Sequence, residues 1–508
     1  MSDLKNATVL VVGAGIMGAG IAQVAAQAGH SVLLFDMREG AAAEAKEKLT
    51  ASLHALVAKG KLSADSVAQT LSNIRAIGTL QEAANAGLVV EAIVEKLEAK
   101  RGLFRELEAI VHSDCILATN TSSISVTAIA NGLQHPQRLV GMHFFNPVPQ
   151  MKLVEVVSGL QTDAAVATAI FALSESWGKV AVHARSTPGF VVNRIARPFY
   201  AETLALLQQQ AASPVVLDAC LRAAGFRMGP CELMDLIGHD TNFAVTQSVY
   251  EANFFDKRYA PSLVQREMVD GGLLGRKSGQ GFYSYAADAT KPAIAPLPNV
   301  VLPSAKSIWV HGHGPLADAL FASCERAVGM DRPHAAEAPP VLHRDEDSAW
   351  IGLEINGCQL RMTDGRCASQ LGSDIAVFDL PLQTTVGTVL AWAPSSRASY
   401  AWTTQAEQWL QALGFNAQRV ADTPGLVVAR SIAMLVNEAA DAVHQGVCSE
   451  AAADAAMKLG VNYPAGPFEW MGLWGATPVC ALLDALDAFY RGERYRVSPL
   501  LRQQTWQE

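Results

Sequence analysis

The sequence predicts a doubly wound parallel α/β domain, then an all-α domain, and then a shortened, degenerate copy of both. Three observations support this order. Short apolar runs alternate with helical patterns through residue 120, which is typical of βαβ units. Helical patterns without strands follow from Pro188 to about residue 270. The motif that begins at Thr187 recurs at Thr423, so the second half repeats the first.

A glycine-rich turn follows the first apolar run, residues 8–12. Gly13, Gly15 and Gly18 have G-x-G-x-x-G spacing: the first permits a sharp turn, the second a close approach of pyrophosphate, and the third close packing of helix on strand. A second apolar run ends at Asp36, where an acceptor for a ribose hydroxyl belongs. We therefore expect a Rossmann-like dinucleotide site. Asp36 favours NAD over NADP because a 2′-phosphate would meet a carboxylate, and Arg38 weakens this preference slightly.

The remaining elements of the first domain follow in order. Helices are predicted over residues 41–59, 63–73, 97–112 and 163–177, and strands over 88–95, 115–120, 138–145, 151–157 and 179–183. Ser122 lies in the polar turn directly after one of these strands. Ligands bind beyond the carboxyl ends of strands in such sheets, so Ser122 is a candidate site residue.

His143 is the strongest catalytic candidate. If the chain folds back near Pro149, His143 and Glu155 become neighbours across two strands. A carboxylate beside an imidazole fixes its tautomer and stabilises the imidazolium that forms when the ring takes a proton. Oxidation of an alcohol by a nicotinamide needs such a base. Ser122 and Asn193 could hydrogen-bond the reacting oxygen, although a lone histidine at a strand end is as often structural.

The sequence divides into five segments. Residues 1–186 form the dinucleotide domain, 187–285 a helical domain that starts at Thr187-Pro188, and 286–304 a proline-containing linker. Residues 305–422 form the degenerate module, in which Gly312 and Gly314 precede a proline and the third glycine is missing. Residues 423–508 repeat the helical domain. Two helical copies suggest an internal pseudo-dimer.

The composition of the chain limits the classes of function that it can have. The chain has 508 residues, 50% hydrophobic and 17% charged, with a net charge of −9. The length predicts several domains, and the charge disfavours general attraction to nucleic acid. We expect no membrane span, since apolar runs of about 18 residues are missing, and no signal peptide. Eight cysteines without metal-binding spacing predict free thiols, no metal site and a cytoplasmic protein.

Five motifs resemble those of the L-3-hydroxyacyl-CoA dehydrogenase family, especially its bacterial 3-hydroxybutyryl-CoA and 3-hydroxyadipyl-CoA branch, which acts in β-oxidation and phenylacetate breakdown. They cover residues 7 to about 285, and the two-copy layout extends the likeness to nearly the whole chain. The motifs are Gly13-Ala-Gly-Ile-Met-Gly18, Val90-Glu-Ala-Ile-Val-Glu95, Thr119-Asn-Thr-Ser-Ser123, His143-Phe-Phe-Asn-Pro-Val-Pro149 and Thr187-Pro-Gly-Phe-Val-Val-Asn-Arg194.

The resemblance implies NAD-dependent oxidation of an L-3-hydroxyacyl-CoA to the 3-oxoacyl-CoA. His143 would be the general base, Glu155 its partner, and Ser122 and Asn193 the contacts of the 3-oxygen. The cofactor residues would be Gly13, Gly15, Ile16, Met17, Gly18, Asp36, Glu95, Lys100 and Asn120. Substrate contacts would include Asn146 and, for the CoA tail, Lys48, His54 and Lys59 on the helix over 41–59. The lysines of that region (Lys46, Lys48, Lys59 and Lys61) could equally form only a solvated face.

The second half departs from the family pattern. Ala429 stands where the first copy has Asn193, so we expect one active site per chain. An L-gulonate-type sugar-acid dehydrogenase, a non-catalytic NAD-binding or scaffolding protein, and a complex component whose hydratase belongs to a partner are the alternatives. The acyl chain, and the choice between a homodimer and an internal pseudo-dimer, stay open.

Overall fold

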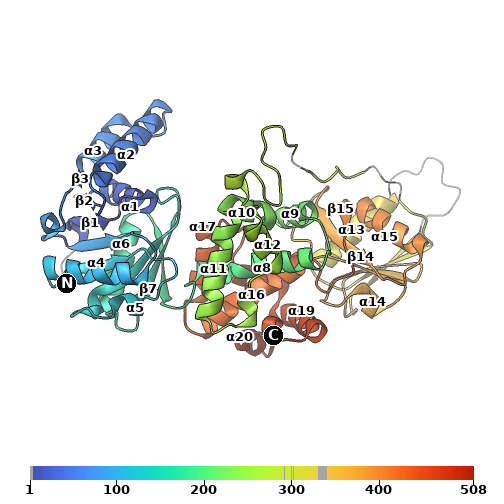
Figure 1. Ribbon diagram of the computed structural model, residues 1–508. Coiled ribbons are helices and arrows are strands. Elements are labelled where there is room, and N and C mark those ends of the chain that lie inside the picture. The colour runs from blue at the N-terminus through green and yellow to red at the C-terminus, as the bar shows by residue number, and fades with distance from the viewer. Residues whose placement is uncertain (1–3, 291, 299, 301, 330–339, 508) are drawn as a thin grey trace. The chain divides into compact units, whose positions relative to one another are not determined.

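The computed structural model describes residues 4–290, 292–298, 300, 302–329 and 340–507 (Figure 1). It divides into two compact units. The first comprises residues up to 195 together with 442–468, and the second comprises 196–441 together with 469–508.

The first unit is built on an eight-stranded sheet of order β3-β2-β1-β4-β5-β6-β7-β8. All neighbouring strands are parallel except β6 and β7, which are antiparallel. The central strands are continuous apolar runs because helices cover both faces of a parallel sheet. This confirms the predicted fold class. The strands are β1 Val9–Val12, β2 Val32–Phe35, β3 Ile74–Ala76, β4 Leu88–Glu91, β5 Ile116–Thr119, β6 Leu139–Phe144, β7 Leu153–Ser158 and β8 Val180–Arg185.

Helices surround this sheet, and Figure 1 shows α2 and α3 as a pair that extends away from it. Lys46 ties this pair to the sheet, since its Nζ donates to the Ile74 carbonyl at 2.5 Å. The helices are α1 Ile16–Gln27, α2 Ala41–Ala58, α3 Ala64–Ser72, α4 Leu97–Ile110, α5 Val126–Ala130, α6 Ala164–Ser176, α7 Val192–Ile195 and α17 Glu450–Gly460, with 3-10 turns η1 Leu4–Asn6, η2 Leu80–Ala83 and η3 Pro136–Arg138.

The predicted helix start at Thr187 is wrong. The chain turns over residues 188–191, and α7 begins only at Val192. Gly189 and Phe190 have φ values of +78° and +46°, which a right-handed helix excludes. The turn matters for the site because it aims the next two backbone N–H groups at Glu155.

Helix α17 comes from the second helical copy, yet it packs on β7, β8 and α7 of the first unit. Its last residue, Gly460, lies so close that a Cβ atom there would stand 2.7 Å from Leu153 Cδ2 and 3.0 Å from Val192 Cγ2. The preceding segment is tied down as well, because Arg185 N donates to the Val447 carbonyl at 2.9 Å. The second half therefore completes the unit that carries His143.

The second unit contains a seven-stranded mixed sheet of order β10-β9-β11-β12-β13-β14-β15. Strand β11 is antiparallel to both of its neighbours, and β13 is antiparallel to β14. This sheet is the predicted reduced copy of the dinucleotide fold. The strands are β9 Ser307–His311, β10 Val341–Asp345, β11 Gly352–Ile355, β12 Cys358–Met362, β13 Ile375–Phe378, β14 Val389–Pro394 and β15 Asn416–Arg419.

The helices of this module and of the two helical copies are as follows: α8 Arg197–Gln208, α9 Pro214–Ala223, α10 Pro230–Ile237, α11 His239–Ala252, α12 Leu263–Asp270, α13 Pro315–Gly329, α14 Ala368–Leu371, α15 Tyr400–Ala412, α16 Val428–His444, α18 Pro467–Trp474, α19 Ala476–Tyr490 and α20 Pro499–Thr505, with η4 Lys257–Tyr259, η5 Arg276–Ser278 and η6 Glu493–Tyr495. The first copy also contributes to the module, because α9 packs on β14.

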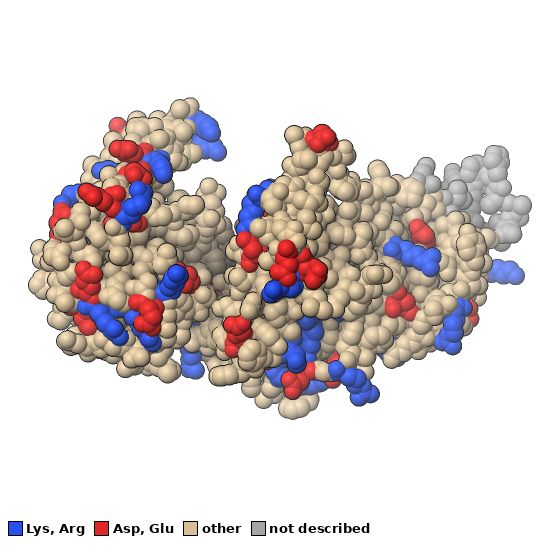
Figure 2. Space-filling view, in the orientation of Figure 1, with Lys and Arg blue, Asp and Glu red and all other residues tan. Residues whose placement is uncertain are grey.

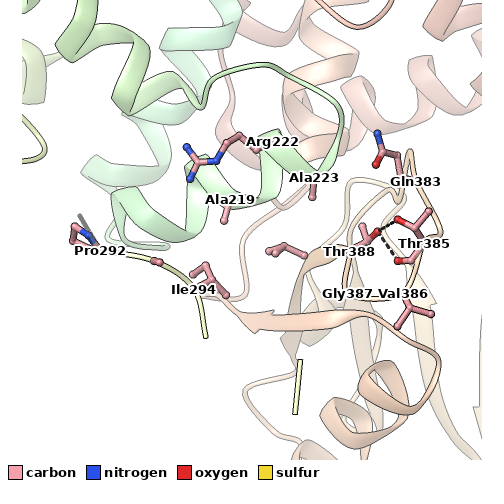
Figure 3. A pocket seen from close by; sticks show the side chains of 12 residues that line it. Ala219, Arg222, Ala223, Pro292, Ile294, Gln383, Thr385, Val386, Gly387 and Thr388 are labelled. Carbon is pink, nitrogen blue, oxygen red and sulfur yellow. Dashed lines mark hydrogen bonds between the residues drawn. The ribbon is translucent and has the colours of Figure 1, made fainter. Parts of the chain in front are cut away.

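Figure 3 shows the cavity beside α9, with Ala219, Arg222 and Ala223 on one side, Thr385–Thr388 on another, and the linker residues Pro292 and Ile294 along its edge. The linker is fixed a few residues further on, where Asn416 Nδ2 donates to the Ala295 carbonyl at 2.8 Å.

The two helical copies interlock through equivalent buried carboxylates. Glu202 of the first copy accepts from Arg494 Nη2 at 2.8 Å and from Arg430 Nε at 2.5 Å, both in the second copy. Glu438 of the second copy accepts from Tyr259 Oη at 2.5 Å, in the first. Burial acts to raise the pKa of Glu202, but the guanidinium groups hold it below its ordinary value. The contacts are reciprocal, as in a two-fold interface.

Candidate active site

His143 and Glu155 meet across the antiparallel pair β6–β7. The register places them directly opposite each other, which confirms the predicted hairpin. The His143 Nδ1 atom lies 2.6 Å from Glu155 Oε2, and the two side chains are 7% and 1% exposed. A carboxylate only accepts hydrogen bonds, so Nδ1 carries a hydrogen and Nε2 is the ring nitrogen that can take a proton.

Two further contacts fix this dyad. Glu155 Oε1 accepts from the backbone N–H groups of Val191 at 3.1 Å and Val192 at 2.9 Å, which are the groups that the 188–191 turn presents. The imidazole packs against Phe145, with ring centroids 4.5 Å apart, and against Phe190 at 5.9 Å. One carboxylate oxygen thus orients the imidazole and the other is anchored to the start of α7.

Ser122 lies at the carboxyl end of β5, where it is bound by Glu95. Glu95 Oε1 accepts from Ser122 N at 2.8 Å and from Ser122 Oγ at 3.2 Å, and from Thr121 Oγ1 at 2.7 Å. Burial acts to raise the pKa of Glu95, but the Lys100 charge and these hydrogen bonds lower it overall. The carboxylate is therefore held ionised, and it sets the position of the Ser122 turn.

A buried ion pair lies beneath Glu95. Lys100 is 1% exposed, and its Nζ contacts Glu91 Oε1 at 2.6 Å and Glu95 Oε2 at 3.1 Å. Glu91 also accepts from Thr119 Oγ1 at 2.6 Å and from Ile93 N at 2.7 Å. Sequence reasoning placed Lys100 on the cofactor and missed Glu91. The available signal was an acid at the end of an otherwise apolar strand, where a buried charge needs a partner.

The glycine turn has the shape that a dinucleotide needs. A Cβ at Gly18 would lie 1.8 Å from the Gly13 carbonyl oxygen, whereas a Cβ at Gly15 would meet nothing within 4 Å. The close contact at Gly18 holds α1 against the strand, and the open space at Gly15 leaves room for pyrophosphate at the helix N-terminus. Ile16 is 79% exposed there, with Met17 beside it.

Asp36 follows β2 and already contacts the glycine turn. Its Oδ2 accepts from Ala14 N at 2.8 Å, and its Oδ1 accepts from Arg38 N at 2.9 Å. The Arg38 guanidinium is engaged by Glu44 through two hydrogen bonds of 3.0 and 2.7 Å. The cation that could have favoured a 2′-phosphate is therefore paired with a carboxylate.

The other predicted site residues lie around this centre or away from it. Asn120 Oδ1 accepts from Phe144 N at 2.8 Å, so that side chain ties β5 to β6. Asn146 is exposed in the turn after β6, and Asn193 lies half-buried in the first turn of α7. Lys48, His54 and Lys59 are exposed on or beside α2, and Figure 2 shows basic side chains at the end of the α2–α3 pair.

The described part of the chain contains no group of three or more His, Cys, Asp and Glu side chains that could hold a metal ion. Its helices also include none that is long and apolar enough to cross a membrane.

The second module also presents a carboxylate to the start of its helical copy, but from the strand equivalent to β6, because β13 pairs antiparallel with β14 as β6 does with β7. Asp379, directly after β13, accepts from the N–H groups of Val427 at 2.9 Å, Val428 at 2.7 Å and Ala429 at 2.9 Å. Val427 and Val428 correspond to Val191 and Val192, whose N–H groups Glu155 binds, and Ala429 corresponds to Asn193. Burial raises the pKa of Asp379 to about 6, although the backbone N–H groups oppose the shift. The module thus retains the attachment of its helical domain but not the base.

Models of known families match most of the chain. The NAD-binding domain of 3-hydroxyacyl-CoA dehydrogenase matches residues 8–187, and the C-terminal domain of the same enzyme matches twice, over 189–285 and 425–506. The chain belongs to the 3-hydroxyacyl-CoA dehydrogenase family. The reduced Rossmann-fold domain of 3-hydroxybutyryl-CoA dehydrogenase matches residues 360–424. This family identity makes the protein an NAD-dependent oxidoreductase and confirms the predicted resemblance, enzyme class and cofactor.

Two of the similar proteins match nearly the whole chain, and a third matches only about half of it. The 3-hydroxyadipyl-CoA dehydrogenase of Escherichia coli K12 is 42% identical over 98% of this chain and 97% of its own length. A crystal structure of 3-hydroxybutyryl-CoA dehydrogenase from Escherichia coli K12 superposes with a TM-score of 0.84, at 41% identity over 99% of this chain and all of the other. The 3-hydroxybutyryl-CoA dehydrogenase of Clostridioides difficile is 40% identical over 54% of this chain and 98% of its own.

Proposed function

We propose that the chain oxidises short-chain L-3-hydroxyacyl-CoA thioesters to 3-oxoacyl-CoA, and catalyses the reverse reaction, at a site formed by His143, Glu155, Ser122 and Asn193. The observation that carries this proposal is the 2.6 Å contact between the buried His143 and Glu155. Among relatives that cover the full chain, one is named for the hydroxyadipyl and one for the hydroxybutyryl substrate.

The residues divide the chemistry as follows. Bound NAD supplies the acceptor for the hydride that leaves C3. His143 Nε2 takes the hydroxyl proton as that hydride departs, and Glu155 stabilises the imidazolium that results. Asn193 donates to the 3-oxygen, and so does Ser122 once its hydroxyl turns from Glu95 Oε1 toward the substrate; these contacts hold the alcohol and polarise the ketone in reverse. The imidazolium then releases its proton to solvent, so one alcohol and NAD give one ketone, NADH and one proton.

An assay of acetoacetyl-CoA reduction by NADH tests this assignment. We expect activity with acetoacetyl-CoA, none with L-gulonate and NAD, and a fall in kcat of about 10² or more in His143→Gln. A rate for His143→Gln equal to that of the unsubstituted chain would overturn the mechanism. Activity on L-gulonate alone would favour the sugar-acid alternative. A comparison of kcat/KM for 3-hydroxybutyryl-CoA and 3-hydroxyadipyl-CoA then shows which acyl chain the enzyme prefers.

The α2 surface is proposed to hold the CoA tail. Lys48, His54 and Lys59 are exposed along it, and phosphates are attracted to such cations. Lys46 is not part of this set, because its ammonium group already donates to the Ile74 carbonyl at the sheet. A Lys48→Gln, Lys59→Gln variant should raise the KM for acetoacetyl-CoA several-fold and leave kcat unchanged. An unchanged KM would mean that these lysines form only a solvated face.

We also propose that the second helical copy acts as an internal partner that supports the dyad. Helix α17 packs on β7 and α7, the two elements that Glu155 joins. Gly460→Ala tests this, because its new Cβ would overlap Leu153 and Val192, whereas a Cβ at Gly472 would meet nothing within 4 Å. A shift of a few tenths of an ångström at a reacting group costs about three- to tenfold in rate. We expect such a loss of kcat for Gly460→Ala and none for Gly472→Ala, and equal kcat values would refute the idea.

A cytoplasmic location is part of the proposal, since the eight cysteines are all free thiols, which suits a reducing compartment.

A further inference from the structure

The second unit contains a cavity of about 640 Å³ in the degenerate module. It lies at the head of α13, the counterpart of α1, and is bordered by Gly312, the chain after β13 at Leu380, and α18. In doubly wound sheets this is the edge at which ligands bind. Its size also falls within the range of about 300–1,000 Å³ that is usual for small-molecule sites.

A dinucleotide does not suit this cavity. Pro315 begins α13 and removes an N–H group from its first turn, and Ala317 occupies the position that Gly18 has in the first copy. The acid at the end of β10, Asp345, is engaged by His311 Nδ1 at 3.1 Å. The features that would bind pyrophosphate and ribose are therefore lost or occupied.

The lining instead suits an uncharged, flat ligand. Of the described residues that line it, none is Lys, Arg, Asp or Glu, and three are tryptophans: Trp350, Trp470 and Trp474. Trp350 is held in place because the Arg361 guanidinium lies 4.4 Å from its ring centroid and His311 stacks on it at 4.2 Å. Leu473, also in the lining, is 82% exposed. An aromatic wall of this kind binds planar apolar groups by area and by ring stacking.

Trp474 contributes a buried polar group to the lining of the cavity. The indole N–H of Trp474 is buried and has no acceptor among the residues that the structure describes. A buried donor without an acceptor costs free energy, and a ligand oxygen would meet that need.

We propose that this cavity is a second small-molecule site, which takes an uncharged planar apolar ligand carrying a carbonyl oxygen. The aromatic body lies against Trp350 and Trp470, and the carbonyl accepts from Trp474. Its residues are different from those of the dehydrogenase centre, and the proposal does not depend on the proposed substrate.

Fluorescence titration of the full chain with N-phenyl-1-naphthylamine, an uncharged probe, tests the cavity. The dehydrogenase site is first filled with acetoacetyl-CoA and NAD, an oxidised pair that cannot react. We expect about one probe per chain and at least tenfold weaker binding in Ala319→Trp, which fills the cavity, and in Leu473→Glu, which charges its rim. Tyr400→Glu is the matched control, because Tyr400 is 89% exposed and lies outside the lining. Equal probe affinity in all four proteins would overturn the proposal.

The carbonyl requirement is tested by displacing the probe with 2-acetonaphthone or with 2-ethylnaphthalene, which lacks the oxygen. Trp474→Phe should lower the affinity for 2-acetonaphthone by about fivefold, as expected for the loss of one hydrogen bond. The affinity for 2-ethylnaphthalene should stay unchanged. An equal effect on both compounds would refute the hydrogen bond to Trp474. Retained acetoacetyl-CoA reduction in every variant shows that the chain is folded and that the effects belong to this cavity.

Discussion

Replacing Glu155 with glutamine should separate its electrostatic role from its anchoring role. The amide oxygen can still accept from Val191 and Val192, which the carboxylate contacts at 3.1 and 2.9 Å. The amide –NH2 group then faces His143 Nδ1 without a negative charge, and because it only donates, Nδ1 must accept and the neutral ring carries its hydrogen on Nε2. The shape of the site is thus kept while the partner of the imidazolium is removed.

The size of the effect follows from the 2.6 Å contact. Charge centres about 4 Å apart attract by about 4 kcal/mol at the effective dielectric constant of partly buried sites. The attraction exists only once His143 is protonated, so it lowers the barrier without strengthening the ground state. At 1.4 kcal/mol for each factor of ten, kcat for oxidation of L-3-hydroxybutyryl-CoA should fall by about 10³, and the KM for that substrate should change less than threefold.

Asp379→Asn is the matched control. It also neutralises a buried carboxylate that binds backbone N–H groups at the start of a helical copy, but no histidine faces that carboxylate. In steady-state oxidation of L-3-hydroxybutyryl-CoA by NAD, the direction in which His143 takes up the proton, Asp379→Asn should show a kcat within about twofold of the unsubstituted chain. A Glu155→Gln enzyme that kept more than a tenth of its kcat would refute the electrostatic argument. Equal losses in the two variants would instead assign the effect to helix anchoring.

Four further results are expected. Asp36→Ser should raise kcat/KM with NADPH by about tenfold or more, and an unchanged value would show that another group selects the cofactor. Glu91→Gln leaves the buried Lys100 charge poorly paired, so the free energy of unfolding measured by urea denaturation should fall by about 3 kcal/mol. Calorimetry should show weaker NAD binding, and an unaltered NAD affinity would show that this ion pair does not affect the cofactor site. Calorimetry should give about one NAD per chain, and two would contradict a degenerate second module. Asp379 has a pKa of about 6 in the folded chain against an ordinary value of 3.8. The folded chain therefore binds the Asp379 proton more tightly than the unfolded chain does. The stability that this proton contributes is present below pH 4 and is lost as the pH rises through 6. Between pH 4 and 7 the unsubstituted chain should therefore lose about 2 kcal/mol more unfolding free energy than Asp379→Asn, and parallel pH curves would contradict the shift.

The parts of the fold that depend on local sequence were predictable. Central strands such as Val9–Val12 are buried on both sides, so they are uninterrupted apolar runs that sequence shows directly. The His143–Glu155 pairing was predictable because a proline turn fixes where the chain reverses, and strand register then places the partners.

The parts of the fold that depend on contacts between distant segments were not predictable from the sequence. A helical pattern over 450–460 shows that a helix forms, but its period does not say that it covers β7 and β8. The left-handed Phe190 is stabilised by tertiary packing that overrides the favourable Thr187-Pro188 start. Glu91 was missed because its partner Lys100 and its acceptor role toward Thr119 come together only in the folded sheet.

These observations indicate why the second half can lose its chemistry and still matter to the first. Its histidine and third glycine are absent, but Asp379 still anchors its helical copy, and buried charges such as Glu202 with Arg430 still join the two copies. Removing one member of a buried ion pair costs several kcal/mol, so these contacts tolerate little change. Helix α17, which packs behind the strand that carries Glu155, belongs to that same locked copy. We therefore expect the geometry of the dyad to depend on packing by the second helical copy, which has Ala429 where the first copy has Asn193.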